Sequence, residues 1–570
     1  MLLIPLAMFC KQKMSAFRCG AFVVFAILAK YLDRERTVAG PFFNRWLVPP
    51  AALCIHLSIG MAYGFSVFWL PLTRAVGIDH SVPCPAGMPW YEKWVMTSYD
   101  WDKPLLGWMY TLFFVFLGSS AALFGRWLEH AGPRKAGLAS ALCWSGGLAI
   151  GSLGVYWHQL WLLCLGAGVV GGIGLGLGYI SPVSTLIKWF PDRRGMATGM
   201  AIMGFGGGAM IGSPLADLLM KHFATAHSVG VWETLLSLSV IYGVFMVIGS
   251  LAYRVPPDGW SPPGWQAPVV ASGLSTTRHV HVNQAWKTPQ FWLLWCVLCM
   301  NVSAGIGVIG MASPMFQEIF GGRLIGLNQE YESLDLAQAG RVAAVAAGFT
   351  GLLSLFNIGG RFFWATLSDM IGRQATYSVF FVFGMILYAM APSAARLGGV
   401  ASFVVIFCLI LTLYGGGFAA IPAYLADLFG TQMVGAIHGR LLTAWSVAGV
   451  VGPVLVNYLN DAQVRAGVPK SIAYDSTLYI LALLLLVGLV CNLLVRPVAD
   501  GWFMTTEELA RERGVAKPGL TGENTFKGPA STGATIQVVA FWALVAIPAF
   551  WGVWITIVNA VGMVRQSLST

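Results

Sequence analysis

The sequence GRWLEHAGPRK at residues 125–135 has a counterpart in the sequence LSDMIGR at residues 367–373. In both, an acidic residue is followed three positions later by glycine and then by a base. Glu129 in the first motif corresponds to Asp369 in the second, 240 positions later. Each motif also joins two long apolar stretches. This pattern indicates that the second half of the chain repeats the first.

Further landmarks recur in the same order and at nearly the same separation. They lie at or near the ends of apolar stretches that are long enough to cross a bilayer. Repeats of this kind build two parallel bundles related by an axis along the membrane normal, which is an architecture of secondary transporters. The paired landmarks are Gly132 and Gly372, Pro182 and Pro422, Gly199 and Gly439, Gly212 and Gly452, and the tripeptide Asp-Gly-Trp at 258–260 and 500–502.

The composition requires a lipid environment. Of 570 residues, 57% are hydrophobic and 10% are charged, and the mean hydropathy is +0.71. So few charged residues cannot cover a water-soluble surface. The net charge of +10 is concentrated in short loops, and no basic stripe for nucleic acid is present. We therefore expect an all-α membrane protein with no nucleic-acid partner.

Apolar stretches of about 20 residues, as a bilayer core of about 30 Å requires, define the domains. Two sets of six are separated by a segment rich in Pro, Gly and Trp, and a last stretch has no counterpart in the repeat. The stretches lie near 46–72, 105–124, 136–156, 160–187, 196–219, 234–253, 291–316, 341–364, 376–391, 398–425, 437–459 and 477–495. The predicted domains are an N-terminal extension (1–40), a six-helix bundle (41–255), a cytoplasmic linker (256–288), a second six-helix bundle (289–497), a polar tail (498–535) and an additional transmembrane helix (536–563).

Loop charge predicts the orientation. Loops rich in Lys and Arg alternate with poorer ones, which places the basic loops in the cytoplasm. We expect a monomeric, multi-pass protein of the cell inner membrane with a cytoplasmic N-terminus. Residues 1–32 suit neither a span nor a signal peptide, and a true start at Met14 is a hypothesis.

The sequence GIGLGLG at 172–178 superficially matches a dinucleotide-binding loop. It follows no strand and lies inside an apolar span. We interpret these glycines as a packing surface that allows neighbouring helices to approach closely.

Both motifs resemble the loop signature of the major facilitator superfamily. The resemblance implies a gate, in which glycine permits a tight turn and the charges pair with neighbouring helices in one conformation only. A solvated turn that only sets the topology is the alternative. The implied gating residues are Glu129, Gly132, Arg134, Asp369, Gly372 and Arg373.

A closer resemblance covers roughly residues 40–505. The sequences NRW at 44–46, KWFPDRRGMATG at 188–199 and GRFFW at 360–364 are similar to the oxalate:formate antiporter family, a carboxylate-carrying branch of the superfamily. A distant likeness to eukaryotic monocarboxylate transporters implies the same class of substrate.

Arg361 is the predicted centre of the substrate site. It stands eight positions before Asp369, which places it about 12 Å inside the membrane. A cation there costs at least about 2.5 kcal/mol, so it should face a cavity and meet an anion. No acidic side chain lies mid-span to neutralise it, and its counterpart in the first half is Ala121. A carboxylate fits the planar guanidinium fork, whereas a snorkelling or carbonyl-bonded structural arginine is the alternative.

The other substrate contacts are aromatic and rest on the resemblance. They match positions that wall the substrate cavity of the family, and packing or lipid contact is the alternative for each. His56, two helical turns before the first of them, is a candidate for proton coupling or a structural histidine. The aromatic residues are Tyr63, Trp108, Tyr179, Phe205, Tyr414 and Phe418.

Trp445 completes the predicted site. It stands where oxalate carriers of the family place a lysine, so a second cation is absent. A small monocarboxylate such as formate, lactate or pyruvate therefore suits the site better than oxalate. We predict a carboxylate exchanger that works by alternating access, with no cofactor, metal ion or catalytic residue. A proton-coupled monocarboxylate symporter and a transporter-like membrane sensor are the alternatives.

Overall fold

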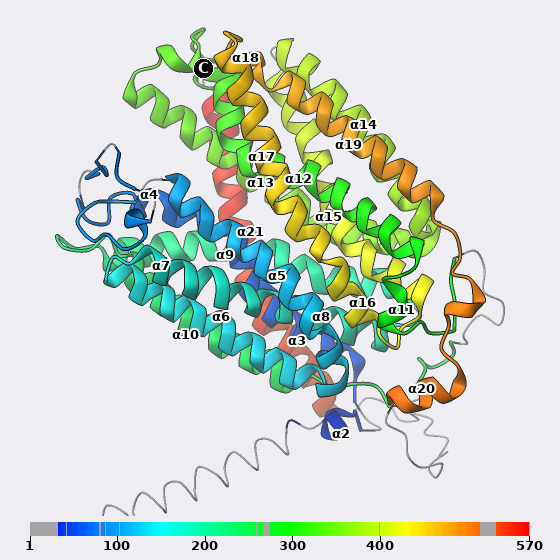
Figure 1. Cartoon of the computed structure of the whole chain (residues 1–570). Helices are drawn as coiled ribbons and strands as arrows, with labels where there is room; N and C mark the ends of the chain where they lie inside the picture. Colours follow the sequence, from blue (N-terminus) through cyan, green and yellow to red (C-terminus); the bar gives the residue numbers. More distant parts are fainter. Residues whose placement is uncertain are drawn as a thin grey trace, which may run out of the picture.

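Figure 1 presents the computed structural model of the chain, which is helical apart from loops and three isolated bridges in its described part. The hypothesis about Met14 and the predictions for residues 1–31 and 514–531 lie outside that part. The described residues are 32, 34–40, 43–78, 81–85, 87–89, 91–101, 103–257, 260–265, 274–397, 399–513 and 532–568.

The described residues of the first half form six long helical segments. They are α3 (Val48–Ile59) with the 3-10 helix η2 (Gly60–Phe68), α5 (Lys103–Ala131), α6 (Pro133–Tyr156), α7 (Leu160–Leu163) with the π-helix η4 (Cys164–Val170) and α8 (Gly171–Trp189), α9 (Arg194–Phe223) and α10 (Val231–Ala252). Shorter helices are α2 (Arg34–Thr37), η1 (Arg45–Leu47), α4 (Trp69–Leu72) and η3 (Glu92–Trp94).

The second half repeats this plan and adds a helix. Its long segments are α12 (Pro289–Phe320), α13 (Leu336–Ile371), α14 (Arg373–Arg396), α15 (Val400–Phe429), α16 (Val434–Leu441) with α17 (Thr443–Arg465), α19 (Asp475–Leu494) and the additional α21 (Thr532–Leu568). Shorter helices are α11 (Val282–Ala285), η5 (Gly321–Ile325), η6 (Tyr331–Ser333), α18 (Lys470–Ala473), η7 (Asp500–Trp502) and α20 (Thr506–Arg513).

The helices confirm the predicted membrane fold. Twelve segments in the described part are long and apolar enough to cross a membrane, among them Thr535–Val558 of α21. The remaining predicted span, 341–364, lies within α13, a helix of 36 residues that packs against α9 and α15. The chain is an all-α membrane protein with two six-helix bundles and an extra C-terminal helix. The exact domain boundaries stay predictions.

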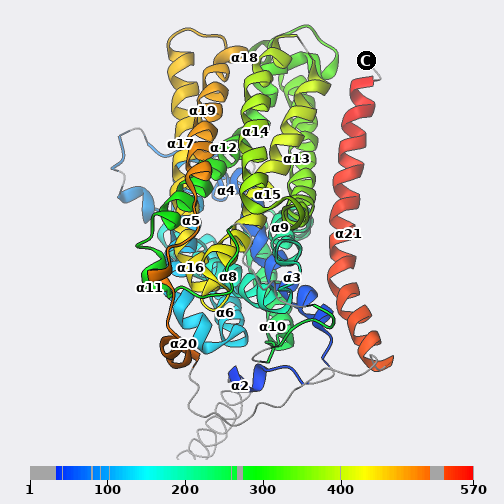
Figure 2. The same ribbon diagram turned by 90° about the vertical axis from the view of Figure 1, so that its right-hand side faces the viewer.

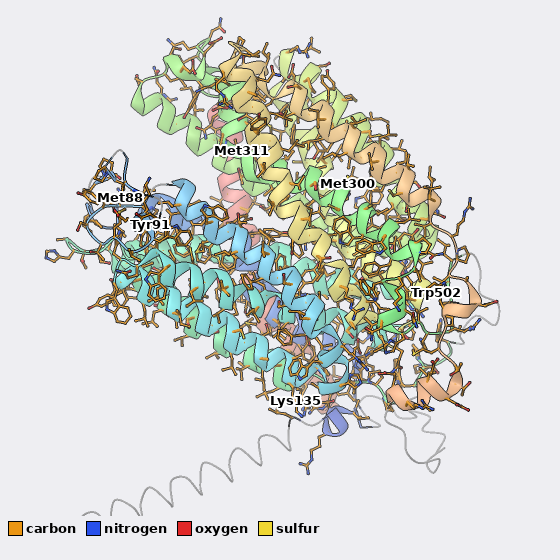
Figure 3. The ribbon with its side chains drawn as sticks, in the orientation of Figure 1. Met88, Tyr91, Lys135, Met300, Met311 and Trp502 are labelled. Atoms are coloured by element: carbon orange, nitrogen blue, oxygen red, sulfur yellow. The ribbon has the colours of Figure 1, made fainter. Side chains whose placement is uncertain are left out.

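The two halves lie side by side, and α21 runs along their outside against α3, α9 and α13 (Figures 1 and 2). We call the end that carries both sequence motifs the motif end. Figure 3 labels Lys135 at this end and Met88 and Tyr91 at the opposite end.

Equivalent turns support the repeat. Gly132 separates α5 from α6 with φ 85°, and Gly372 separates α13 from α14 with φ 87°. A side chain is strained at such positive φ values, so glycine is required at both turns. The repeated glycine of the two motifs therefore has the same structural cause in each half.

The glycines of α8 confirm the packing interpretation. A methyl group on Gly172 would lie 2.8 Å from the Phe116 Cβ of α5, and one on Gly176 would lie 2.4 Å from the Leu117 carbonyl oxygen. A methyl group on Gly174 would lie 2.5 Å from the backbone nitrogen of Trp144 in α6. Alternate glycines thus let α8 touch two neighbouring helices at backbone distance.

We predict that Gly174→Ala destabilises the protein by about 1–3 kcal/mol, because the methyl group would overlap a backbone that cannot move alone. Gly359→Ala is the matched control, since Gly359 lies in α13 with nothing within 4 Å of an added methyl group. That change should stabilise its helix by about 0.5–1 kcal/mol. Thermal unfolding in detergent tests the pair, and equal melting temperatures for both variants would contradict the packing interpretation.

Candidate functional site

Seven aromatic side chains meet between the two halves, and we call them the aromatic cluster. Trp445 is at its centre, fully buried, with its ring 4.4 to 6.3 Å from five other rings. The hydroxyl groups of Tyr63 and Tyr414, from opposite halves, are 3.2 Å apart. The cluster consists of Tyr63, Phe114, Tyr179 and Phe205 from the first half and Tyr414, Phe418 and Trp445 from the second.

The cluster contains six of the seven predicted aromatic contacts. Trp108 is the exception: its side chain is 55% exposed, and within the described residues its ring does not touch the cluster. Phe114, six positions later in α5, was not predicted, although its ring lies 5.6 Å from that of Trp445. A substrate contact at Trp108 stays a prediction.

Arg361 lies beside the cluster and is fully buried. Its Nε donates to the Asn357 side-chain oxygen at 3.0 Å, and its Nη1 donates to the Ile202 carbonyl oxygen of α9 at 3.0 Å. The guanidinium carbon is 6.0 Å from the Phe205 ring centre and 5.5 Å from that of Phe418. The side chain therefore joins α13 to α9 across the two halves and does not point toward lipid.

The charge of Arg361 has no counter-ion among the described residues. No carboxylate there lies within ion-pair distance of it, and its Nη2 has no hydrogen-bond partner. The buried Tyr179 hydroxyl and Trp445 Nε1 also lack partners within that part of the chain. Buried donors without acceptors cost free energy, so an acceptor that supplies a negative charge fits this position.

Glycines make room for the Arg361 side chain and for the helix backbone that carries it. A methyl group on Gly206 would lie 3.1 Å from the Arg361 Nε, and one on Gly415 would lie 2.3 Å from the Asn357 carbonyl oxygen. Neither glycine was predicted. Asn357 was also missed, although a polar residue four positions before Arg361 in an apolar helix is a visible signal.

His56 is buried in α3, and backbone groups face both of its ring nitrogens. Nδ1 lies 2.5 Å from the Ala201 carbonyl oxygen, and Nε2 lies 3.2 Å from the Tyr179 carbonyl oxygen. A neutral imidazole can donate to only one of these oxygens, whereas the protonated ring can donate to both. This geometry suits a structural histidine and also provides acceptors for a second proton.

At the motif end, each motif acid binds the start of a helix in the opposite half. Glu129 accepts from the Gly435 backbone nitrogen at 3.0 Å, one residue after α16 begins. Asp369 accepts from the Gly195 and Met196 nitrogens of α9 at 2.8 and 2.9 Å. Carboxylates stabilise helix N-termini by satisfying free N–H groups and the helix dipole. The two contacts hold the halves together at this end.

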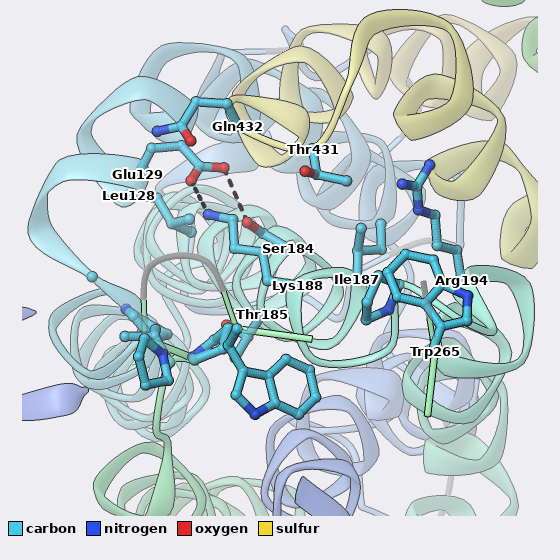
Figure 4. Close-up of a pocket in the computed structure, with 17 residues that line it drawn as sticks. Leu128, Glu129, Ser184, Thr185, Ile187, Lys188, Arg194, Trp265, Thr431 and Gln432 are labelled. Carbon is cyan, nitrogen blue, oxygen red and sulfur yellow. Dashed lines mark hydrogen bonds and ion pairs between the residues drawn. The ribbon is translucent and has the colours of Figure 1, made fainter. Parts of the chain in front are cut away.

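Further charges reinforce these contacts. Glu129 accepts from Lys188 at 2.5 Å and from the Ser184 hydroxyl at 3.0 Å, beside a cavity of about 240 Å³ (Figure 4). Arg373 forms ion pairs with two carboxylates: its Nη2 lies 2.6 Å from Asp369 Oδ1, and its Nε lies 3.0 Å from Asp427 Oδ2. Asp427 also pairs across the halves with Arg194 at 2.9 Å.

Arg134 has a different environment. It is buried, and its Nε donates to the Tyr253 carbonyl oxygen within its own half at 3.0 Å. Of the predicted gating residues, the two acids and Arg373 therefore lie in the contact network between the halves, whereas Gly132 and Gly372 form the turns.

We predict that Asp369→Asn weakens closure of the motif end, because the amide carries no charge and offers one acceptor oxygen to two helix N–H groups. Asp217→Asn is the matched control, since among the described residues Asp217 pairs only with the exposed Lys221 of its own helix. Spin labels at the exposed positions 193 and 284 should move apart in the first variant and not in the control. Unchanged distances in Asp369→Asn would contradict this role.

Comparison with known proteins places these features in a family. The family model of the Major Facilitator Superfamily matches residues 52–453. The oxalate:formate antiporter of Oxalobacter formigenes is 28% identical over 281 residues, which cover 49% of this chain and 59% of the antiporter. The apicoplast pyruvate carrier 1 of Toxoplasma gondii is 26% identical over 58% of this chain and 63% of the carrier. The chain thus spans only about three fifths of either relative.

Solved structures share the fold. The fucose:proton symporter of Escherichia coli superposes with a TM-score of 0.54 at 12% identity, over 80% of this chain and all of that protein. A bacterial homologue of the iron transporter ferroportin gives 0.51 at 14% identity over 79% of this chain and 99% of its own. The predicted resemblances to the major facilitator superfamily and to the oxalate:formate antiporter family are confirmed. This multi-pass membrane protein belongs to the Major Facilitator Superfamily of transporters.

Proposed function

We propose that this transporter exchanges small monocarboxylates across the membrane, with Arg361 binding the carboxylate group. The observation that carries the proposal is the open Nη2 of a fully buried guanidinium with no counter-ion among the described residues. A carboxylate can accept from Nη2 and neutralise the charge, and the unpartnered Trp445 Nε1 of the adjoining cluster is a further donor. The carboxylate-related names of the two relatives support the same substrate class.

A small monocarboxylate fits better than a dianion. The cation of Arg361 faces aromatic rings from both halves, and Trp445 occupies the centre of the cluster. Such surroundings accept one negative group and an apolar body, but the described residues around Arg361 offer no second fixed cation for oxalate. Formate, lactate and pyruvate are therefore the first substrates to examine.

Alternating access follows from the bonds between the halves. The caps on α9 and α16 close the motif end, and these bonds must break for that end to open. An anion bound to Arg361 would neutralise the buried guanidinium charge while the halves move. In an empty site the same charge would stay buried without a counter-ion, which costs free energy. This difference favours exchange over net transport.

The proposal includes an orientation. The basic loops of the sequence favour a motif end and an N-terminus in the cytoplasm of a cell whose inner membrane holds the protein. In that orientation, the contacts of Glu129 and Asp369 close the path to the cytoplasm. Both motif acids would then act as gating residues.

We predict that Arg361→Gln lowers pyruvate counterflow in proteoliposomes at least about thirtyfold, because a desolvated charged hydrogen bond contributes about 2–5 kcal/mol. Arg361→Lys should retain part of the activity, since it keeps the charge but loses the planar fork. Arg341→Gln is the matched control at an exposed position of the same helix. Labelled formate, lactate, pyruvate and oxalate form the test panel. Full counterflow by Arg361→Gln would refute the proposal.

Proton-coupled symport is the second candidate, supported by the two carbonyl oxygens that face His56. Under symport, an inward proton gradient should accelerate pyruvate uptake, and His56→Gln should remove this response. Under exchange, the gradient should not change counterflow by the wild type or the variant. A gradient response that survives in His56→Gln would exclude His56 as the coupling residue.

A further inference from the structure

A second buried histidine lies outside the site described above. His438 of α16 is 1% exposed, and neither of its ring nitrogens has a hydrogen-bond partner among the described residues. Its ring centre is 5.9 Å from that of Tyr179, whose hydroxyl also lacks a partner there. Buried polar groups in native proteins normally have partners, so this unpaired set requires an explanation.

His438 lies in α16, between the cap at the motif end and the aromatic cluster. It follows Gly435, which Glu129 caps at the motif end, by three residues and precedes Trp445 of the aromatic cluster by seven. The next residue, Gly439, is pressed against α5, since a methyl group there would lie 2.2 Å from the Ala121 carbonyl oxygen. His438 therefore lies between the Arg361 site and the closed motif end.

Tyr179 connects the two places. Its ring is 5.2 Å from Trp445 in the cluster and 5.9 Å from His438, and the two partners belong to the opposite half of the molecule. The ring centre of His56 also lies 5.4 Å from that of Tyr179, but the ring nitrogens of His56 face backbone oxygens. Of these two histidines, only His438 has ring nitrogens free to bind a ligand in the described residues.

We propose that His438 and Tyr179 form a transit site, a second carboxylate-binding position between Arg361 and the motif end. The proposal rests on the proposed function. When the motif end opens, a carboxylate that leaves Arg361 accepts from the Tyr179 hydroxyl and then from a His438 N–H group. A neutral imidazole is sufficient, because one ring nitrogen always carries a donor. While the motif end is closed, the Tyr179 hydroxyl and the two ring nitrogens of His438 have no hydrogen-bond partner among the described residues.

His438→Phe keeps an aromatic ring against Tyr179 and removes both nitrogens. We expect this variant to unfold at the same temperature as the wild type or higher, because it buries no unpaired nitrogen. Its pyruvate affinity, measured by tryptophan fluorescence, should be unchanged, while pyruvate counterflow should fall about tenfold, as the loss of one hydrogen bond on the path implies. His438→Gln retains a donor and should restore most of the rate. His222→Phe, the same change at an exposed position of α9, is the control.

Two outcomes would overturn the transit site. Wild-type counterflow by His438→Phe would show that the nitrogens do not contact the substrate in transit. A loss of pyruvate affinity as large as that of Arg361→Gln would place His438 in the first binding site. Either result leaves the carboxylate exchange itself standing. If the wild type neither binds nor exchanges any carboxylate of the panel, the proposed function and the transit site fail together.

Discussion

The proposed substrate site depends most on one buried cation, the guanidinium group of Arg361. Arg361 lies in α13, ten residues before the end of that helix, fully excluded from solvent, and two neutral oxygen atoms accept from it. A charge in such a place is expensive unless an opposite charge accompanies it. The described part of the chain offers no such partner, and the surrounding aromatic rings supply only weak attraction through their faces. This constraint is the reason that we propose an anion, and a carboxylate in particular, as the ligand of Arg361.

A second constraint holds the two halves together, namely the pairing of the motif acids with helix starts. Glu129 binds α16 and Asp369 binds α9, so each half supplies one acid and one helix start. The arrangement follows from the internal repeat and explains why both motifs carry an acid in the last turn of the long helix that precedes the glycine. The bond from Gly435 to Glu129 is buried and the bonds from Gly195 and Met196 to Asp369 are partly buried, and together they hold the two halves in contact at the motif end.

The sequence predicted the repeat, the membrane spans and the burial of Arg361, since each produces a signal along the chain. Recurring glycines, the length of the apolar stretches and a single cation within a span can be read from the sequence without knowing which helices pack together. Trp108 and Phe114 show the limit: both are aromatic residues of α5, and only the packing of α5 against α17 distinguishes the exposed ring from the clustered one. The caps across the halves and the unpaired His438 were not visible either. Both features depend on which distant helices pack against each other. No local pattern in the sequence indicates these pairings.

The most direct measurement is a structure of the protein with pyruvate bound. The account predicts that the carboxylate lies between the halves, with one oxygen about 2.8 Å from the Arg361 Nη2 and the methyl end against the aromatic cluster. It also predicts that Arg361 keeps its bonds to Asn357 and Ile202. Pyruvate bound elsewhere, with Nη2 still unpaired or paired with a carboxylate of the protein, would contradict the account.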